Sequence, residues 1–186
     1  MNDYKTNTIL ESQALMCLKH IQLELCENPV GRIHNLRRFA DTWYCYTRGL
    51  VSRSMSADWH RIDFNYELTH GIVELIEEHS IIGLKKMKSK LYVKKEHVIP
   101  IGVIEKKLLK LGKTASVDDI ADILNKNLIY ATISKKEDAM LRDKNTTGGN
   151  LNSKMPNEYY DESHELYEDP FARYKIKGIK IFNRNQ

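Results

Sequence analysis

Residues 94–101 read Lys-Lys-Glu-His-Val-Ile-Pro-Ile and contain a side chain that is suited to acid–base chemistry. His97 stands between a glutamate and an apolar run, close after a segment with the pattern of a strand. A neutral imidazole accepts a proton near neutral pH, which is what a general base must do. His97 is therefore a candidate catalytic base. The alternative is a structural histidine at the end of a strand.

Two predicted strands and one predicted helix would position this histidine. Residues 91–93, Leu-Tyr-Val, indicate a strand just before it. Residues 127–134, Asn-Leu-Ile-Tyr-Ala-Thr-Ile-Ser, give the clearest strand pattern in the chain. Ser134 and Glu137 then have the spacing of a capping box, which predicts a helix from residue 135 to about residue 143. The expected order is strand, strand, helix.

The other predicted elements are helices. In the first third of the chain, apolar residues recur at steps of three and four, the period of an amphipathic helix. Helices are expected there at residues 8–26, 33–51 and 58–79. Two more are expected between the predicted strands, at residues 104–111 and after the N-cap Ser116. The aromatic residues of the second helix are expected in a core rather than stacked on bases: Trp43, Tyr44 and Tyr46.

The composition narrows the classes of protein that are possible. Hydrophobic residues make up 41% and charged residues 29%, as in ordinary folded soluble proteins. No apolar run approaches the roughly 18 residues of a membrane span, and no secretory signal is evident. Three cysteines without Cys-x-x-Cys spacing argue against a disulfide framework or a cysteine zinc site, and favour a reducing cytoplasm. A formal net charge of +4 suits a polyanionic partner without requiring one.

The order strand, Glu-His, connection, strand, helix resembles the HNH nucleases, also called ββα-metal nucleases. The string Glu-His-Val-Ile-Pro at residues 96–100 is similar to the string that ends the first strand in that family. The likeness covers about residues 88–145. It implies one role for each of four residues: Glu96 binds a divalent ion, His97 activates water, Asp138 in the helix completes the metal site, and Asn127 packs the loop.

Asp138 is assigned to the ion in preference to Glu137 for a physical reason. In a capping box the glutamate turns back to the backbone N–H of the N-cap residue. Asp138 lies one position further on, about 100° round the helix, and is free to face the strands. The alternatives are that Asp138 only complements the helix dipole, that Glu96 is a surface carboxylate, and that Asn127 is a helix C-terminal cap.

The reaction of the family explains these residue types. Phosphodiester hydrolysis needs an activated water and a cation that stabilises charge on the phosphate. Mg²⁺ (or Mn²⁺) prefers carboxylate oxygens and keeps several waters, so Glu96 and Asp138 form a suitable pair. Zinc is less suited, because only one histidine is nearby. The chain departs from the family in the long segment between His97 and the second strand, and in the aspartate at the helix position where His or Asn is usual.

Basic residues around the motif are candidate phosphate contacts. Lysines crowd the segment before Glu96, and such charges give salt-dependent binding of nucleic acid. The alternative is a solvated strand and turn. The residues expected to contact nucleic acid are Lys90, Lys94, Lys95, Arg142, Lys154 and Arg173.

The sequence thus predicts an α+β protein in three parts. A helical N-terminal unit covers residues 1–83 and is expected to serve docking or homodimerisation. A ββα-metal-like module follows at residues 84–145. An irregular C-terminal tail, residues 146–186, is expected to pack on the module and to wrap its surface rather than form a core.

The predicted function is metal-dependent endonuclease activity on DNA in the cytoplasm. A phage or restriction-type role is suggested by association alone. One alternative is a non-catalytic regulator or inhibitor that binds nucleic acid or protein on a nuclease-like scaffold. Another is an adaptor that contacts only proteins through its N-terminal helices.

Overall fold

The structure, a computed structural model, describes residues 8–27, 32–48, 67–91 and 93–182. The chain forms two compact units, each made of two separate stretches. Unit 1 contains residues 1–58 and 101–128, and unit 2 contains residues 59–100 and 129–186. The expected boundaries after residues 83 and 145 differ from this division, because the helices between the predicted strands belong to unit 1.

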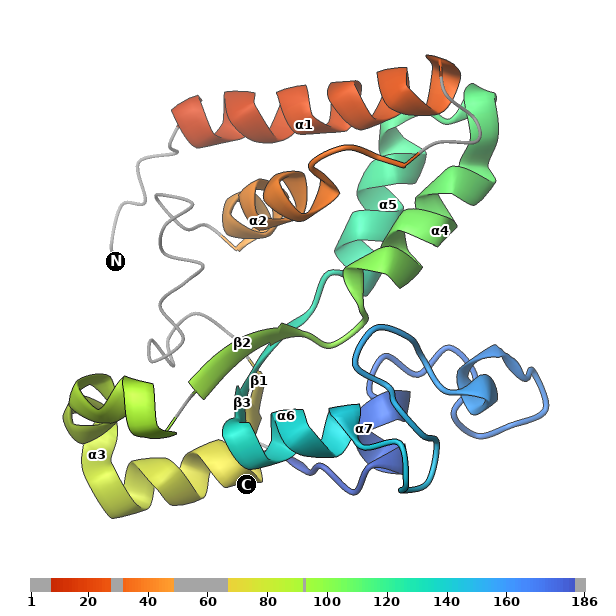
Figure 1. The fold of residues 1–186 in the computed structure, drawn as a ribbon. Coiled ribbons are helices and arrows are strands. Elements are labelled where there is room, and N and C mark those ends of the chain that lie inside the picture. Colours follow the sequence, from red (N-terminus) through yellow and green to blue (C-terminus); the bar gives the residue numbers. More distant parts are fainter. Residues whose placement is uncertain (1–7, 28–31, 49–66, 92, 183–186) are drawn as a thin grey trace. The chain divides into compact units, whose positions relative to one another are not determined.

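Unit 1 is helical (Figure 1). Its helices are α1 Thr8–Glu27, α2 Leu36–Thr47, α4 Ile101–Leu111 and α5 Val117–Asn127, with a 3₁₀ turn at Gly112–Thr114. α1 packs against the other three helices. Apolar residues at helical spacing form the core between them, including Leu18, Ile21, Ala40, Leu108 and Ile120. The first predicted helix and the two after the Glu-His motif are confirmed.

Local signals fix the connection between α4 and α5. Gly112 has φ 69°, a left-handed conformation that glycine adopts without strain, and α4 ends just before it. The Ser116 hydroxyl accepts a hydrogen bond from the Asp119 backbone N–H at 3.1 Å. The Asp119 carboxylate accepts one from the Ser116 N–H at 2.9 Å. This complete capping box starts α5 where the sequence predicts a helix.

Unit 2 is built on a four-stranded sheet in the order β2-β3-β1-β4. The strands are β1 Glu67–Thr69, β2 Val93–His97, β3 Tyr130–Ser134 and β4 Ile181–Phe182. β2 and β4 run antiparallel to their neighbours, and β1 runs parallel to β3. The remaining elements are α3 His70–Leu91, α6 Lys135–Arg142, a 3₁₀ turn at Asn157–Tyr160 and α7 Ala172–Ile176. The chain is therefore an α+β protein.

Two boundaries differ from the prediction. The helix expected at residues 58–79 falls partly outside the described residues, and its later part is β1 followed by α3. β1 has only three residues and takes its partners from β3 and β4, distant in sequence. α3 bends at Ser80, which has φ 58°. The strand expected at 91–93 begins instead at Val93 and extends to His97, since Leu91 still ends α3.

The C-terminal segment forms part of the core of unit 2, which corrects the expectation of a surface wrap. Tyr174 and Ile179 pack with Val98 of the β2 end and Ile133 of β3 in one buried cluster. Buried Lys177 donates to the Asp143 carbonyl at 2.9 Å. The apolar anchors of this segment are spread too irregularly to show helix or strand periodicity. None of the helices in the described ranges has the length and apolarity required to cross a membrane.

Candidate functional site

The candidate site lies where β2, β3 and α6 meet in unit 2. β2 pairs with β3 in antiparallel register, with Glu96 opposite Ala131 and His97 opposite Tyr130. α6 follows β3 directly and begins at Lys135. The order strand, strand, helix that the sequence indicates is therefore the order found within this unit, although the two strands are joined through the helices of unit 1.

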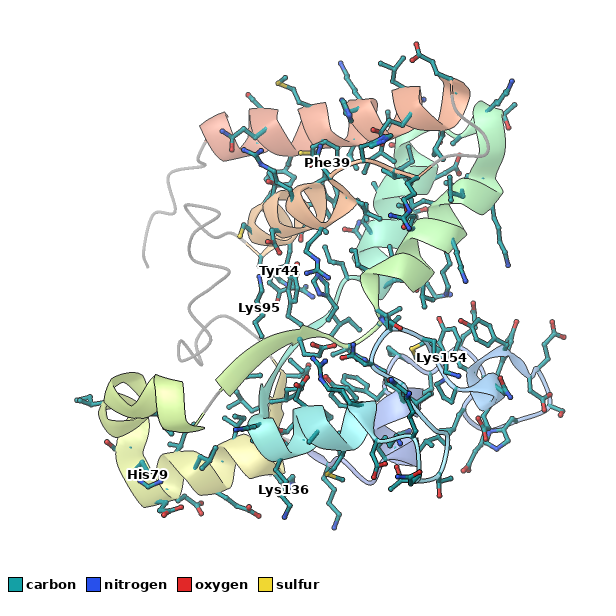
Figure 2. All side chains as sticks on the ribbon, in the orientation of Figure 1. Phe39, Tyr44, His79, Lys95, Lys136 and Lys154 are labelled. Carbon is teal, nitrogen blue, oxygen red and sulfur yellow. The ribbon has the colours of Figure 1, made fainter. Side chains whose placement is uncertain are left out.

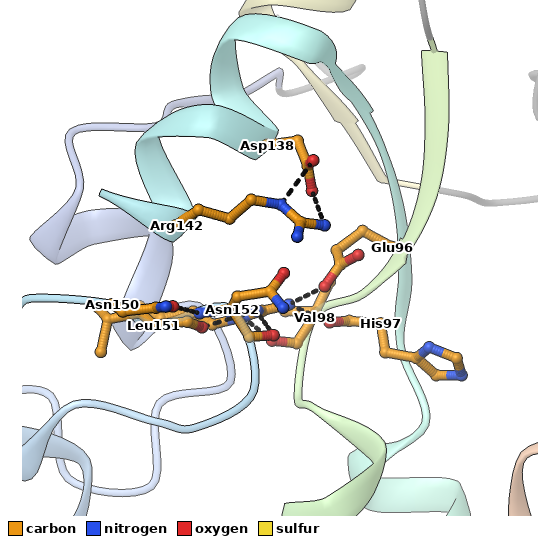
Figure 3. A network of polar contacts seen from close by, with 9 residues as sticks. Glu96, His97, Val98, Asp138, Arg142, Asn150, Leu151 and Asn152 are labelled. Atoms are coloured by element: carbon orange, nitrogen blue, oxygen red, sulfur yellow. Dashed lines mark hydrogen bonds and ion pairs between the residues drawn. The ribbon is translucent and has the colours of Figure 1, made fainter. Parts of the chain in front are cut away.

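Glu96 and Asp138 are brought to the same side of the strand pair. Both residues are buried, at 8% and 7% exposure. Figure 3 shows their carboxylates pointing toward one space beside the guanidinium of Arg142. Glu96 comes from β2 and Asp138 from the first turn of α6.

His97 is not part of this arrangement, which corrects the expected convergence of the imidazole with the two carboxylates. Successive side chains of a strand point to opposite faces. The His97 ring accordingly points away from Glu96 and Asp138 (Figure 3). It packs against the ring of Tyr130, its partner in the ladder, with 4.6 Å between ring centroids. Lys95, on the same face, places its ammonium 4.4 Å from the Tyr130 ring centroid.

Glu96 is held by Arg173 from α7. The guanidinium Nη2 donates to the Glu96 carboxylate at 2.9 Å, and Arg173 is fully buried. The same guanidinium donates to the carbonyls of Val98 at 2.8 Å and Leu151 at 3.0 Å, and also to the carbonyl of His97. Arg173 therefore ties the end of β2 to the C-terminal segment. It is buried within the protein, which corrects its expected role as a nucleic-acid contact.

Asp138 is held differently, by a cation at the surface. Arg142, one helical turn later, donates from Nε to the Asp138 carboxylate at 3.0 Å. The Arg142 side chain is 51% exposed. Asp138 itself is buried, so this pair is open to solvent only on the arginine side, whereas Arg173 is fully buried beside Glu96.

Glu137 has the structural role that the sequence predicts. Its carboxylate accepts from the Ser134 N–H at 2.8 Å, and the Ser134 hydroxyl accepts from the Glu137 N–H at 3.3 Å. The same buried carboxylate accepts from the Thr69 hydroxyl at 2.6 Å and the Gly71 N–H at 3.1 Å. The capping box therefore also locks α6 to the junction of β1 and α3. Asp138 is left to face the strand pair.

Asn127 serves the helical unit and not the candidate site. Its amide Nδ2 donates to the Ile123 carbonyl at 2.7 Å, and its Oδ1 accepts from the Lys107 ammonium at 3.0 Å. Asn127 is buried at the end of α5, in unit 1, whereas Glu96 and Asp138 belong to unit 2. The expected role in packing the nuclease loop is therefore corrected to that of a helix-end residue, the alternative that its position also suggests.

The other residues expected to contact nucleic acid lie in different environments. The side chains of Lys90 and Lys94 lie outside the described part of the structure. Lys95 lies over the Tyr130 ring. Lys154, labelled in Figure 2, is exposed in the C-terminal segment. Arg142 is exposed but pairs with Asp138.

The carboxylate pair limits which ions are suitable. Within the described ranges, no group of three or more His, Cys, Asp and Glu side chains is placed to hold a metal. Mg²⁺ uses one or two carboxylates and retains its waters, so the chemistry of Glu96 and Asp138 matches that ion. Each carboxylate already has a guanidinium partner, Arg173 for Glu96 and Arg142 for Asp138.

Two features of the site were not predicted from the residues around His97. The Asp138–Arg142 pair has the i, i+4 spacing of helical ion pairs, and this signal is visible in the sequence. Arg173 carries no comparable signal, because its acceptors come from segments distant in sequence. Comparisons of the chain with protein-family models, with curated proteins and with solved structures find no match.

Proposed function

We propose that this chain is a Mg²⁺- or Mn²⁺-dependent nuclease that hydrolyses DNA phosphodiester bonds on the α6 side of the β2–β3 pair. One observation carries the proposal. Two buried carboxylates from different elements, Glu96 and Asp138, point toward the same space beside the half-exposed Arg142. Both carboxylates take a cationic partner here, Arg173 for Glu96 and Arg142 for Asp138, which supports a place that accommodates positive charge.

Each residue has a distinct role in this proposal. Glu96 and Asp138 would hold the ion, which when bound stabilises charge on the phosphate and lowers the pKa of a coordinated water. Arg173 positions Glu96 through the 2.9 Å contact, and Glu137 fixes the start of α6. Arg142, released from Asp138, is long enough and exposed enough to pair with a phosphate oxygen.

The proposal assigns no proton transfer to His97. Its imidazole lies on the opposite face of β2 from both carboxylates, against Tyr130. Hydrolysis at this site would therefore rely on Glu96, Asp138 and Arg142, and the proton of the attacking water would pass to bulk solvent. In this respect the proposed mechanism differs from the one implied by the resemblance to HNH nucleases.

A second candidate function is a non-catalytic regulator or inhibitor on a nuclease-like scaffold. The observation that favours it is that both carboxylates are neutralised by arginines, while His97 points away from them. Carboxylates that are already paired with arginines need no metal ion to balance their charge. Such a protein would bind nucleic acid or protein without cleaving it.

Nicking of supercoiled plasmid in Mg²⁺ or Mn²⁺ distinguishes the two functions. The variants are Asp138→Asn, His97→Ala and, as a matched control, Asp122→Asn at an exposed position of α5. The nuclease proposal expects nicking by the wild type, the control and His97→Ala, and its loss in Asp138→Asn with unchanged thermal unfolding. Binding of the plasmid by the protein without any cleavage supports the regulator. Nicking by Asp138→Asn at the wild-type rate contradicts the proposed site.

A further inference from the structure

A second site lies in unit 1, where the C-terminal ends of α2 and α5 border an open pocket of about 520 Å³. Its walls include three aromatic residues of α2, Trp43, Tyr44 and Tyr46, and it is also lined by Leu124, Asn125 and Arg48. The volume falls in the range of small-molecule sites, about 300–1,000 Å³. Aromatic walls with a few polar groups are the usual composition of such sites.

The orientation of the Asn125 amide is set by Trp43. The Trp43 indole Nε1 donates to Asn125 Oδ1 at 2.9 Å. Because an indole N–H is only a donor, the oxygen of the amide must face it and the nitrogen must face elsewhere. Asn125 is exposed and lines the pocket, so it offers a ligand its N–H groups and the second lone pair of its oxygen.

The charge near the pocket comes from two sources of opposite sign. The last carbonyls of two helices make its helix ends weakly negative, which disfavours an anion among them. Arg48, exposed at the end of α2, places its guanidinium 5.3 Å from the Tyr44 ring centroid and supplies positive charge. The pocket therefore suits an uncharged ring whose anionic substituent lies near Arg48.

The aromatic residues provide a stacking surface for such a ring. Trp43 and Tyr44 are 6% and 2% exposed and belong to the core, as the sequence predicts. Tyr46 is only partly buried, and its ring lies 5.6 Å from that of Trp43 at 55° between planes. Nucleobases stack on partly exposed aromatic side chains of this kind.

We propose that this pocket binds an adenine base. Adenine presents an N–H donor beside a ring nitrogen acceptor, the pattern that an asparagine amide pairs with in bidentate fashion. Asn125 would read this edge, Tyr46 would stack on the ring, and Arg48 would meet the phosphate. The base can come from free adenosine monophosphate or from single-stranded nucleic acid. This inference concerns unit 1 and does not rest on the proposed nuclease function.

Calorimetric titration of the full chain tests the proposal with adenosine monophosphate, adenosine and ribose 5-phosphate as probes. Adenosine monophosphate and adenosine are expected to bind, and ribose 5-phosphate is not. Asn125→Asp keeps an acceptor for Trp43 but removes the N–H donors, and is expected to weaken adenosine binding about tenfold or more. Because adenosine carries no charge, weaker adenosine binding by Asn125→Asp cannot result from repulsion between the ligand and the new carboxylate. The matched control Asn145→Asp, at an exposed position of unit 2, is expected to bind like the wild type.

Tyr46→Ala and an oligo(dA) titration complete the test. Loss of the stacking ring is expected to weaken adenosine binding about tenfold. Tighter binding of oligo(dA) than of the mononucleotide assigns the site to single-stranded nucleic acid, and equal or weaker binding assigns it to the free nucleotide. The proposal is overturned if adenosine does not bind at millimolar concentration, if ribose 5-phosphate binds equally well, or if Asn125→Asp binds adenosine like the wild type.

Discussion

Arg173 and Glu96 form an ion pair of 2.9 Å in which the guanidinium is fully buried. The pair joins α7 to β2, two elements that are distant in sequence. The remaining donors of Arg173 satisfy carbonyls at the end of β2 and at Leu151. The guanidinium therefore links the candidate site to the C-terminal segment and makes that segment a requirement for the geometry of Glu96.

Arg173→Met is expected to destabilise unit 2 by about 3–5 kcal/mol, because it leaves the Glu96 carboxylate buried without its cation. Urea unfolding followed by circular dichroism measures the change. The control is Lys175→Met on the same helix, whose ammonium pairs with Asp169 at 2.6 Å but is 60% exposed. That exposed pair contributes about 0–1 kcal/mol. Similar losses in the two variants would show that burial of Arg173 does not matter.

Gly71→Ala is expected to destabilise the protein, and Gly102→Ala is not. Both glycines are the second residue of a helix. A Cβ at Gly71 would lie 2.8 Å from the Glu137 carboxylate, which its hydrogen bonds hold in place. A Cβ at Gly102 meets nothing within 4 Å, so the gain in helix propensity, up to about 1 kcal/mol, is expected there. Thermal unfolding of the two variants compares them directly, and an equal effect contradicts the prediction.

The hydrogen bonds of Asp119 in the capping box predict that the stability of the protein depends on pH. Hydrogen bonds from the Ser116 side chain, and then from its backbone, hold the pKa of Asp119 below its usual range. Because the pKa is lower in the folded state, the contribution of this cap is present above the unfolded pKa of about 3.9 and is lost as the pH falls through the folded pKa. In Ser116→Ala, a carboxyl NMR titration is expected to show the pKa of Asp119 moving upward. An unchanged midpoint would contradict the assigned cause.

Arg142→Ala is expected to strengthen Mg²⁺ binding if the two carboxylates hold the ion. The guanidinium lies 3.0 Å from Asp138 and competes with any other cation there. Calorimetric titration with MgCl₂ measures the affinity, and Lys136→Ala, also exposed on α6, serves as the control. Higher affinity in Arg142→Ala alone supports a shared site. Weaker or unchanged Mg²⁺ binding in that variant counts against Asp138 as a ligand.

Local sequence signals were sufficient for the element starts that depend on neighbouring residues. The Ser134–Glu137 and Ser116–Asp119 capping boxes form at the predicted places, because each satisfies backbone groups within a span of four residues. The predicted strand ended at Val93, so the opposite orientation of Glu96 and His97 followed only from the extension of β2 to His97.

The tertiary structure decided what depends on partners distant in sequence. β1 exists as a strand because β3 and β4 pair with it, and three residues give no periodicity of their own. Arg173 is a buried anchor and not a surface contact, because carbonyls and a carboxylate from separate segments surround it. The sequence by itself therefore determined the local hydrogen bonding of the capping boxes. Only the assembled fold determined which charges are desolvated and with which partners.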